Sequence, residues 1–123
     1  MALQKQEQIL CKALHTDLGK SKTESVMCEI GLVQGEIRWM KQHLGRLCRQ
    51  KHVRTPLAQF AAKSYQSPSP YGNVLIMSPW NYPVLLTLEP LVDAIAAGNT
   101  AVVKPSAYAP VSANVLKLSL IHI

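Results

Sequence analysis

The stretch from Pro70 to Pro110 constrains the fold of this chain more than any other segment. Residues 73–78 (NVLIMS) form a short apolar run rich in Val and Ile, which is typical of a strand buried on both faces. Residues 79–83 (PWNYP) follow as a turn between two prolines, and Pro83 suits the first turn of a helix, where its missing N–H costs nothing. A second apolar run, residues 100–104 (TAVVK), ends at Pro105.

A helix is predicted between these two strands. One of its faces carries apolar residues at spacings of three and four, namely Leu85, Leu88, Val92 and Ile95. Gly98 and Asn99 then end the helix, because glycine is favoured just past the last turn. Two buried strands joined by a helix predict a right-handed parallel crossover, so the fold class is α/β.

The polar residues of this unit gather where such folds bind ligands. Open parallel sheets bind their ligands at the carboxyl ends of the strands. Those ends are residues 78–81 (SPWN) and residues 104–106 (KPS). The pattern therefore predicts a binding site formed by these two segments.

Four short motifs in this region carry a family resemblance. They are PYG at 70–72, PWNYP at 79–83, AIAAGN at 94–99 and KPS at 104–106. In this order and spacing they resemble the aldehyde dehydrogenase superfamily, especially the branch of the fatty-aldehyde and class 3 enzymes. Upstream, DLGKSKTES at 17–25, CEIGLV at 28–33 and EIRWMKQHL at 36–44 resemble the amino-terminal helices of that branch.

The resemblance implies an enzyme that oxidises an aldehyde to a carboxylic acid through a thiohemiacetal, hydride transfer and thioester hydrolysis. It assigns Asn81 a catalytic role, in which the side-chain amide donates to the aldehyde oxygen as that oxygen becomes an oxyanion. From spacing alone, an asparagine two residues before a helix-starting proline is also a common helix cap. The sequence leaves both roles of Asn81 open.

The resemblance also implies a site for NAD or NADP at the same edge. Lys104, with Ser106 beside it, would hydrogen-bond the hydroxyls of the adenosine ribose. Ala107 stands where many relatives have a glutamate that grips those hydroxyls and would repel a 2′-phosphate, so NADP remains possible. Without the resemblance, Lys104 could equally be a solvated residue at a strand end.

A further part of the cofactor site is implied at the end of the first strand. The backbone of Met77, Ser78, Pro79 and Trp80 would line the nicotinamide side of the cleft. Taken alone, Trp80 could equally be a packing residue, and both roles can hold together.

Two helices are predicted ahead of this unit, over about residues 3–18 and 21–49. The resemblance implies that they are followed by the β-α-β portion of a Rossmann-like NAD(P)-binding domain, which is truncated here. The first carries Ile9, Leu10, Ala13 and Leu14 on one face. Ser21 and Glu24 form a capping box that opens the second. The second carries an apolar stripe in steps of four and three: Val26, Ile30, Val33, Ile37, Met40, Leu44 and Leu47. The spacing of Gly31 and Gly35 indicates that another backbone approaches closely there.

The segment from residue 37 to residue 88 contains no acidic residue, and the whole chain carries a net charge of +6. Its basic residues gather at the end of the second helix: Lys41, Arg46, Arg49, Lys51 and Arg54, with His43 and His52. A solvated helix end, favoured by the helix dipole, explains them without a nucleic-acid partner. A nucleic-acid surface is the alternative, although no recognition motif or interleaved aromatics accompany the charges.

Residues 55–70 are expected to form a loop, a short strand and a linker. In the related enzymes this region leads into a β-hairpin of the oligomerisation element, so the resemblance implies a homo-oligomeric parent enzyme. A length of 123 residues with 48% hydrophobic content allows one domain with a core. No apolar run reaches the roughly 18 residues that a membrane span needs, and a cytoplasmic protein is expected.

The cysteines, Cys11, Cys28 and Cys48, are odd in number and widely spaced. This spacing argues against a disulfide framework or a zinc site, and it favours buried thiols in a reducing compartment. No metal site is predicted. None of the three cysteines matches the nucleophile of the family.

Three segments of the family have no counterpart in this sequence: the glycine-rich pyrophosphate turn, the catalytic-cysteine segment and the general-base glutamate segment. The expectation is therefore an amino-terminal fragment that is inactive alone. After Pro110 a helix is predicted with Val111, Val115 and Leu118 on its apolar face, and residues 119–123 are expected not to belong to the native protein. The alternatives are a non-catalytic interaction module or a basic nucleic-acid-binding fragment.

Overall fold

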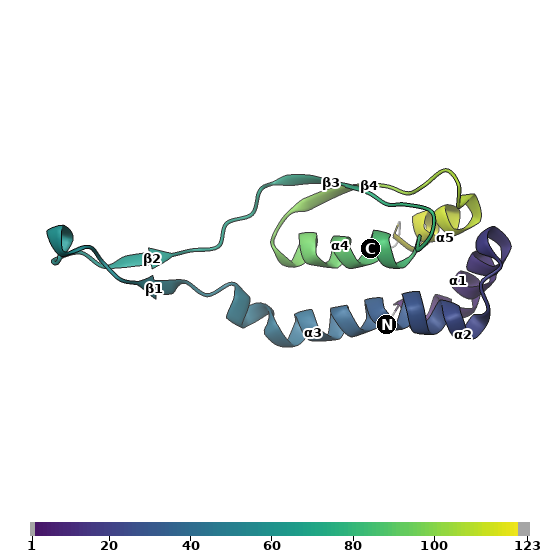
Figure 1. The fold of residues 1–123 in the computed structure, drawn as a ribbon, viewed down its shortest axis with the longest axis horizontal. Helices are drawn as coiled ribbons and strands as arrows, with labels where there is room; N and C mark the ends of the chain where they lie inside the picture. The colour runs from purple at the N-terminus through teal and green to yellow at the C-terminus, as the bar shows by residue number, and fades with distance from the viewer. Residues whose placement is uncertain (1, 121–123) are drawn as a thin grey trace.

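The computed structural model describes residues 2–120. Its helices are α1 (Ala2–Leu18), α2 (Lys22–Ser25), α3 (Gly31–Leu47), α4 (Leu85–Ala96) and α5 (Pro110–Leu120), with a π-helical turn η1 (Val26–Ile30) and a 3-10 turn η2 (Leu57–Gln59). Its strands are β1 (Lys51–Val53), β2 (Ser64–Gln66), β3 (Asn73–Met77) and β4 (Thr100–Lys104). The predicted α/β class is confirmed (Figure 1).

The predicted strand–helix–strand unit is present. Strands β3 and β4 pair in parallel, in a register that runs from Asn73 opposite Thr100 to Met77 opposite Lys104. Helix α4 packs on one face of this two-stranded sheet and lies between the sheet and α3 (Figure 1). The other face of the sheet is apolar and exposed: Leu75, Met77 and Val102 are each more than 60% exposed.

The second predicted helix is a continuous helical run from Lys22 to Leu47, interrupted by the π-helical turn η1. Its apolar stripe is confirmed near η1, where Ile30 and Val33 are fully buried. Burial fades towards the far end, and Leu44 and Leu47 are exposed there. The apolar stripe of α3 packs against α4. The last turns of α3 extend past the end of α4, so the stripe has little to pack against there.

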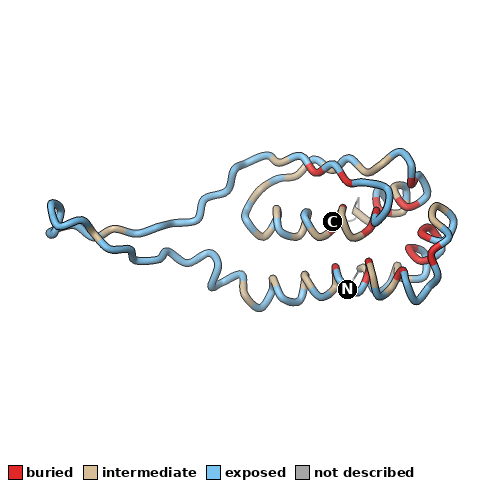
Figure 2. The backbone as a smooth tube through the Cα atoms, in the orientation of Figure 1, coloured by how far each residue is buried: buried red, intermediate tan, exposed pale blue. Residues whose placement is uncertain are grey.

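The core lies at one end of the molecule, where α1, η1, α5 and the start of α4 meet (Figure 2). Its buried members are Leu10, Cys11, Leu14, Ile30, Val33, Val84, Leu88 and Leu116. The predicted apolar faces of α1 and α4 were wrong in part. Ile9 and Ile95 are more than half exposed, because the neighbouring elements cover the adjacent faces of α1 and α4.

The predicted apolar face of α5 was also wrong in part, since Val115 alone of its three residues packs against the core cluster. Helix α5 packs against α1 through the side that carries Ser112 and Leu116, which are both buried, while Val111 and Leu118 are exposed. The predicted non-native tail began at residue 119. Within it, Leu120 packs against the core cluster, and Ile121–Ile123 lie outside the described residues.

Residues between α3 and β3 form an arm that projects from the body (Figures 1 and 2). Strands β1 and β2 pair antiparallel along it, and η2 lies near its tip. The short strand expected within residues 55–70 is present as β2, whereas its partner β1, within the basic segment, was not predicted. Leu57 and Phe60 near the tip are 86% and 85% exposed.

Candidate functional site

Two glycine motifs join the amino-terminal ends of β3 and β4. Gly98, with φ +82°, ends α4 in a Schellman motif: its N–H donates to the carbonyl of Ile95, and the N–H of Asn99 donates to the carbonyl of Ala94. The Asn99 side chain accepts a hydrogen bond from the Gly72 N–H at 2.9 Å. The PYG and AIAAGN motifs therefore set the register of the two strands from this side.

The opposite, carboxyl edge of the sheet is where the site was predicted. The Ser78 N–H donates to the Lys104 carbonyl at 3.2 Å, which continues the ladder one residue past β3. The ends of the two strands therefore meet, as expected from the parallel crossover. Met77, Trp80 and the Lys104 side chain are exposed at this edge, so it is open to a ligand.

The Ser78 side chain is used inside the protein. Ser78 is buried, and its hydroxyl lies 2.6 Å from the hydroxyl of Thr87 on α4. The Thr87 hydroxyl also lies 2.5 Å from the Pro83 carbonyl oxygen. This pair fastens the end of β3 to the first turns of α4. A ligand at this edge would thus meet the backbone of Ser78 and not its hydroxyl.

Ser106 and Ala107 begin the turn that leads from β4 to α5. The Ser106 hydroxyl accepts a hydrogen bond from the Tyr108 N–H at 3.2 Å, which fixes the turn. As a hydroxyl it keeps its own proton to donate. Ala107 is exposed and carries no charge, as noted from the sequence.

Asn81 is exposed in the turn between β3 and α4. Its carbonyl oxygen accepts a hydrogen bond from Lys20 Nζ at 2.8 Å. Within residues 2–120 its side-chain amide forms no hydrogen bond, so it does not cap α4. The cap comes from another helix: Glu29 Oε2 accepts hydrogen bonds from the N–H groups of Val84 at 2.8 Å and Leu85 at 3.1 Å.

Glu29 and Lys20 form a buried ion pair beneath this turn. The Glu29 side chain is fully buried, and its Oε1 lies 2.6 Å from Lys20 Nζ. The same ammonium lies 3.9 Å from the centroid of the Tyr82 ring, in a cation–π contact. Sequence reasoning missed this pair, although there was a signal. Glu29 lies three residues after Val26 and four before Val33, in the middle of the apolar stripe.

A second carboxylate caps α5 in the same way. Asp17, at the end of α1, accepts hydrogen bonds from the N–H groups of Val111 at 3.2 Å and Ser112 at 2.7 Å. A carboxylate at a helix amino terminus satisfies free N–H groups and interacts favourably with the helix dipole. The helices α4 and α5 thus both begin on carboxylates from the amino-terminal helical segment.

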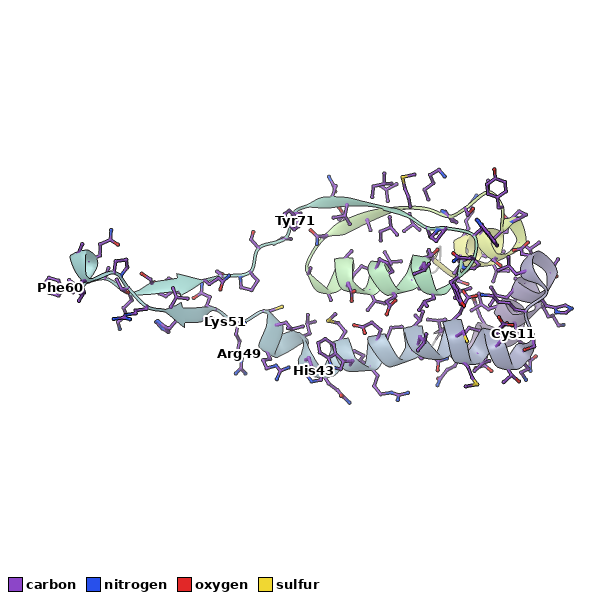
Figure 3. The ribbon with its side chains drawn as sticks, viewed as in Figure 1. Cys11, His43, Arg49, Lys51, Phe60 and Tyr71 are labelled. Carbon is purple, nitrogen blue, oxygen red and sulfur yellow. The ribbon has the colours of Figure 1, made fainter. Side chains whose placement is uncertain are left out.

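The three cysteines lie on the amino-terminal helical segment or just past it, and not on the strands of the carboxyl edge. Burial raises the pKa of the Cys11 thiol, and the nearby Glu7 carboxylate raises it further, which disfavours the nucleophilic thiolate. Cys28 is half-buried and Cys48 is exposed, so the expectation of buried thiols fails for Cys48, which lies just past the last turn of α3. Figure 3 shows Cys11 near α1, at the end of the molecule away from the arm.

The basic side chains follow the last turns of α3 and the start of the arm, as His43, Arg49 and Lys51 show in Figure 3. All but the half-buried His43 of the predicted set are exposed. Among residues 2–120, no group of three or more His, Cys, Asp or Glu side chains is placed to hold a metal ion. No helix in this part of the chain is long and apolar enough to cross a membrane.

The fold and the carboxyl edge define an α/β unit of the kind expected from the four motifs, and comparison with known proteins agrees. The model of the aldehyde dehydrogenase family matches residues 1–122. The chain belongs to the aldehyde dehydrogenase family.

Individual relatives place the chain more closely. It is 47% identical over 116 residues to the 4,4'-diaponeurosporen-aldehyde dehydrogenase of Staphylococcus aureus, covering 94% of this chain and 25% of that protein. It is 42% identical over 116 residues to human aldehyde dehydrogenase family 3 member B1, covering 94% of this chain and 24% of that protein. The chain therefore spans about a quarter of the length of these relatives.

A solved structure shows the same arrangement of elements. The structure described as the substrate-bound state of Staphylococcus aureus AldH superposes with a TM-score of 0.95 at 45% identity, covering 98% of this chain and 26% of that chain. The crystal structure of aldehyde dehydrogenase 21 from Physcomitrella patens matches with a TM-score of 0.80 at 23% identity, which supports the fold alone.

Proposed function

We propose that this chain is part of an NAD(P)-dependent aldehyde dehydrogenase that oxidises an aldehyde to a carboxylic acid. The carboxyl edge of the β3–β4 sheet supports the proposal, because an exposed Asn81 side chain without a hydrogen-bond partner among the described residues lies in the turn that continues from it. Asn81 would donate its amide to the aldehyde oxygen as negative charge develops there. The nucleophile and the general base would come from the remaining three quarters of the enzyme.

The residues at this edge fit a dinucleotide. The exposed Lys104 ammonium is available to ribose hydroxyls, and the Ser106 hydroxyl can donate beside it. The uncharged Ala107 fits NAD and NADP alike, since no carboxylate there would repel a 2′-phosphate. The backbone of residues 77–80 would face the nicotinamide. The bound cofactor would supply the hydride acceptor.

We further propose a homo-oligomeric, cytoplasmic enzyme. The exposed apolar residues of the arm, Leu57 and Phe60, support a contact with a second copy. The free thiols of Cys11, Cys28 and Cys48 suit a reducing compartment.

A chimera tests the proposed activity. This chain would replace the matching quarter of the Staphylococcus aureus relative, and NAD(P)H formation would be followed with short and long aldehydes. We expect aldehyde-dependent turnover with one or both cofactors. A folded chimera that binds the cofactor but never reduces it would contradict the proposal.

A further inference from the structure

The turn that carries Asn81 is held from below by two side chains of the amino-terminal helices. Lys20 lies 61 residues before Asn81, yet its ammonium donates to the Asn81 carbonyl at 2.8 Å. Glu29 lies 55 residues before Val84 and accepts from two successive N–H groups just past the turn. The backbone on both sides of Tyr82 and Pro83 is therefore fixed by one ion pair.

The ion pair itself is costly to bury. Its Glu29 carboxylate is fully buried and Lys20 nearly so, and such a pair gains little stability over apolar residues of the same size. Its partners are nevertheless arranged around the Asn81 turn: Glu29 accepts from Lys20, Val84 and Leu85, and Lys20 donates to Glu29 and to Asn81 and lies over the Tyr82 ring. A costly arrangement with every contact aimed at one turn points to a role for that turn.

The π-helical turn places Glu29 at this position. Residues Val26–Ile30 are wound more widely than an α-helix, and the Gly31 N–H donates to the Val26 carbonyl five residues back. Turns of this kind are rare and frequently occur at functional sites. Here the π turn provides a carboxylate inside an otherwise apolar stripe.

We propose that Lys20 and Glu29 are positioning residues for Asn81, which they hold by its backbone so that its amide stays free and aimed at the reacting oxygen. This inference rests on the proposed function of Asn81 as an oxyanion donor. Such a donor stabilises the transition state only if it is already in place, and a displacement of about 1 Å can cost about 100-fold in rate. Their hydrogen bonds to this turn all go to main-chain groups, so both act through the main chain.

Two variants of the chimera test the proposal. Glu29→Gln keeps the shape of the side chain but removes the charge that holds Lys20. The double variant Lys20→Met/Glu29→Gln removes both charges and leaves no unpaired ion, so it retains the fold even if a single change disturbs it. Asp17→Asn is the matched control, because Asp17 caps α5 through the same chemistry and its hydrogen bonds to the described residues go to Val111 and Ser112.

We expect both test variants to lower kcat about 10- to 100-fold while KM changes less than about threefold, since an interaction made only in the transition state is lost. Asp17→Asn should keep kcat within about twofold. A fall in kcat for Asp17→Asn equal to that of Glu29→Gln would overturn the proposal, because any lost helix cap would then have the same effect.

A double-mutant cycle with Asn81→Ala separates positioning from general support. If Glu29 acts through Asn81, Glu29→Gln should lower kcat little further once the Asn81 amide is absent. Losses that multiply in the Asn81→Ala background would refute the positioning role while leaving the oxyanion role of Asn81 intact. An Asn81→Ala chimera with unchanged kcat would instead remove the proposed function of Asn81, and the positioning role with it.

Discussion

Gly31 lies directly against the carbonyl oxygen of Val26, and a β-carbon on Gly31 would sit 2.7 Å from that oxygen. The close approach expected at this glycine is therefore real, but it comes from the π turn of the same helix and not from another element. Gly35, the second glycine of the expected pair, has nothing within 4 Å of its β-carbon position, so the expectation was wrong there.

These two glycines predict opposite effects of the same substitution. Gly35→Ala should stabilise the chimera by up to about 1 kcal/mol, because alanine is the better helix former. Gly31→Ala should destabilise it and lower kcat, since the π turn must rearrange and Glu29 moves with it. Chemical unfolding and turnover, measured for both variants side by side, check the difference. Equal stabilisation by both would show that the π turn is not needed.

Asn81→Ala in the chimera should lower kcat by about 100- to 1000-fold, the usual cost of one oxyanion donor. Binding of NAD(P) should change far less, because the amide is assigned to the substrate oxygen. Steady-state kinetics and a fluorescence titration of the cofactor measure the two effects. Normal turnover would show that the Asn81 amide is not needed for the reaction.

The 123-residue chain alone should have no aldehyde dehydrogenase activity. The buried Cys11 has a raised pKa, and none of the three cysteines matches the family's nucleophile. NAD(P)H formation would be followed with short and long aldehydes against a heat-treated sample. Turnover above that control would contradict the expectation.

The isolated chain should also self-associate, because the exposed sheet face and the arm leave large apolar side chains in water. Leu75→Lys with Val102→Lys should reduce association, whereas Ile9→Lys, which adds charge on α1 away from the sheet, should have a smaller effect. Sedimentation measures the difference. A monomer that melts sharply and cooperatively without these changes would be the opposite result.

Glu36 predicts a pH dependence of stability. Partial desolvation raises the pKa of the Glu36 carboxyl above its ordinary value of 4.5, and the Asp93 and Glu89 carboxylates raise it further. A pKa that is higher in the folded state gives stability that is complete below the unfolded value and is lost as pH rises through the folded value. Glu36→Gln should therefore stabilise the chimera at pH 8, and its advantage should shrink as pH falls towards 4.5.

Glu24→Gln is the matched control for this effect. Glu24 lies in the exposed first turn of α2, where a carboxylate interacts favourably with the helix dipole. Its replacement should therefore not raise the stability of the chimera at pH 8. Unfolding midpoints at pH 8 and pH 5 distinguish the two variants. A Glu36→Gln advantage that grows as pH falls would reverse the predicted sign.

Local patterns predicted the parts of the fold that depend on neighbouring residues. The β3–α4–β4 unit was predicted from its apolar runs, prolines and Gly98, and the meeting of Ser78 with Lys104 followed from the parallel crossover. The contacts of Lys20 and Glu29 with the Asn81 turn were missed because these partners lie 55 to 61 residues away, beyond any periodic pattern. The π turn also rotates the residues that follow it around the helix axis relative to those before it. A pattern of apolar residues in steps of three and four does not reveal this rotation.

The two carboxylate caps make helices late in the sequence depend on residues near its start. Asp17 and Glu29 lie on the first helices, and the helix termini that they hold lie beyond residue 80. An exchange of sequence between relatives with a crossover anywhere from residue 30 to residue 80 would combine caps from one parent with helix termini from the other. Because the capped groups are main-chain N–H groups, natural or engineered recombinants of this family should tolerate such crossovers when the parent that supplies the amino-terminal part carries both acids.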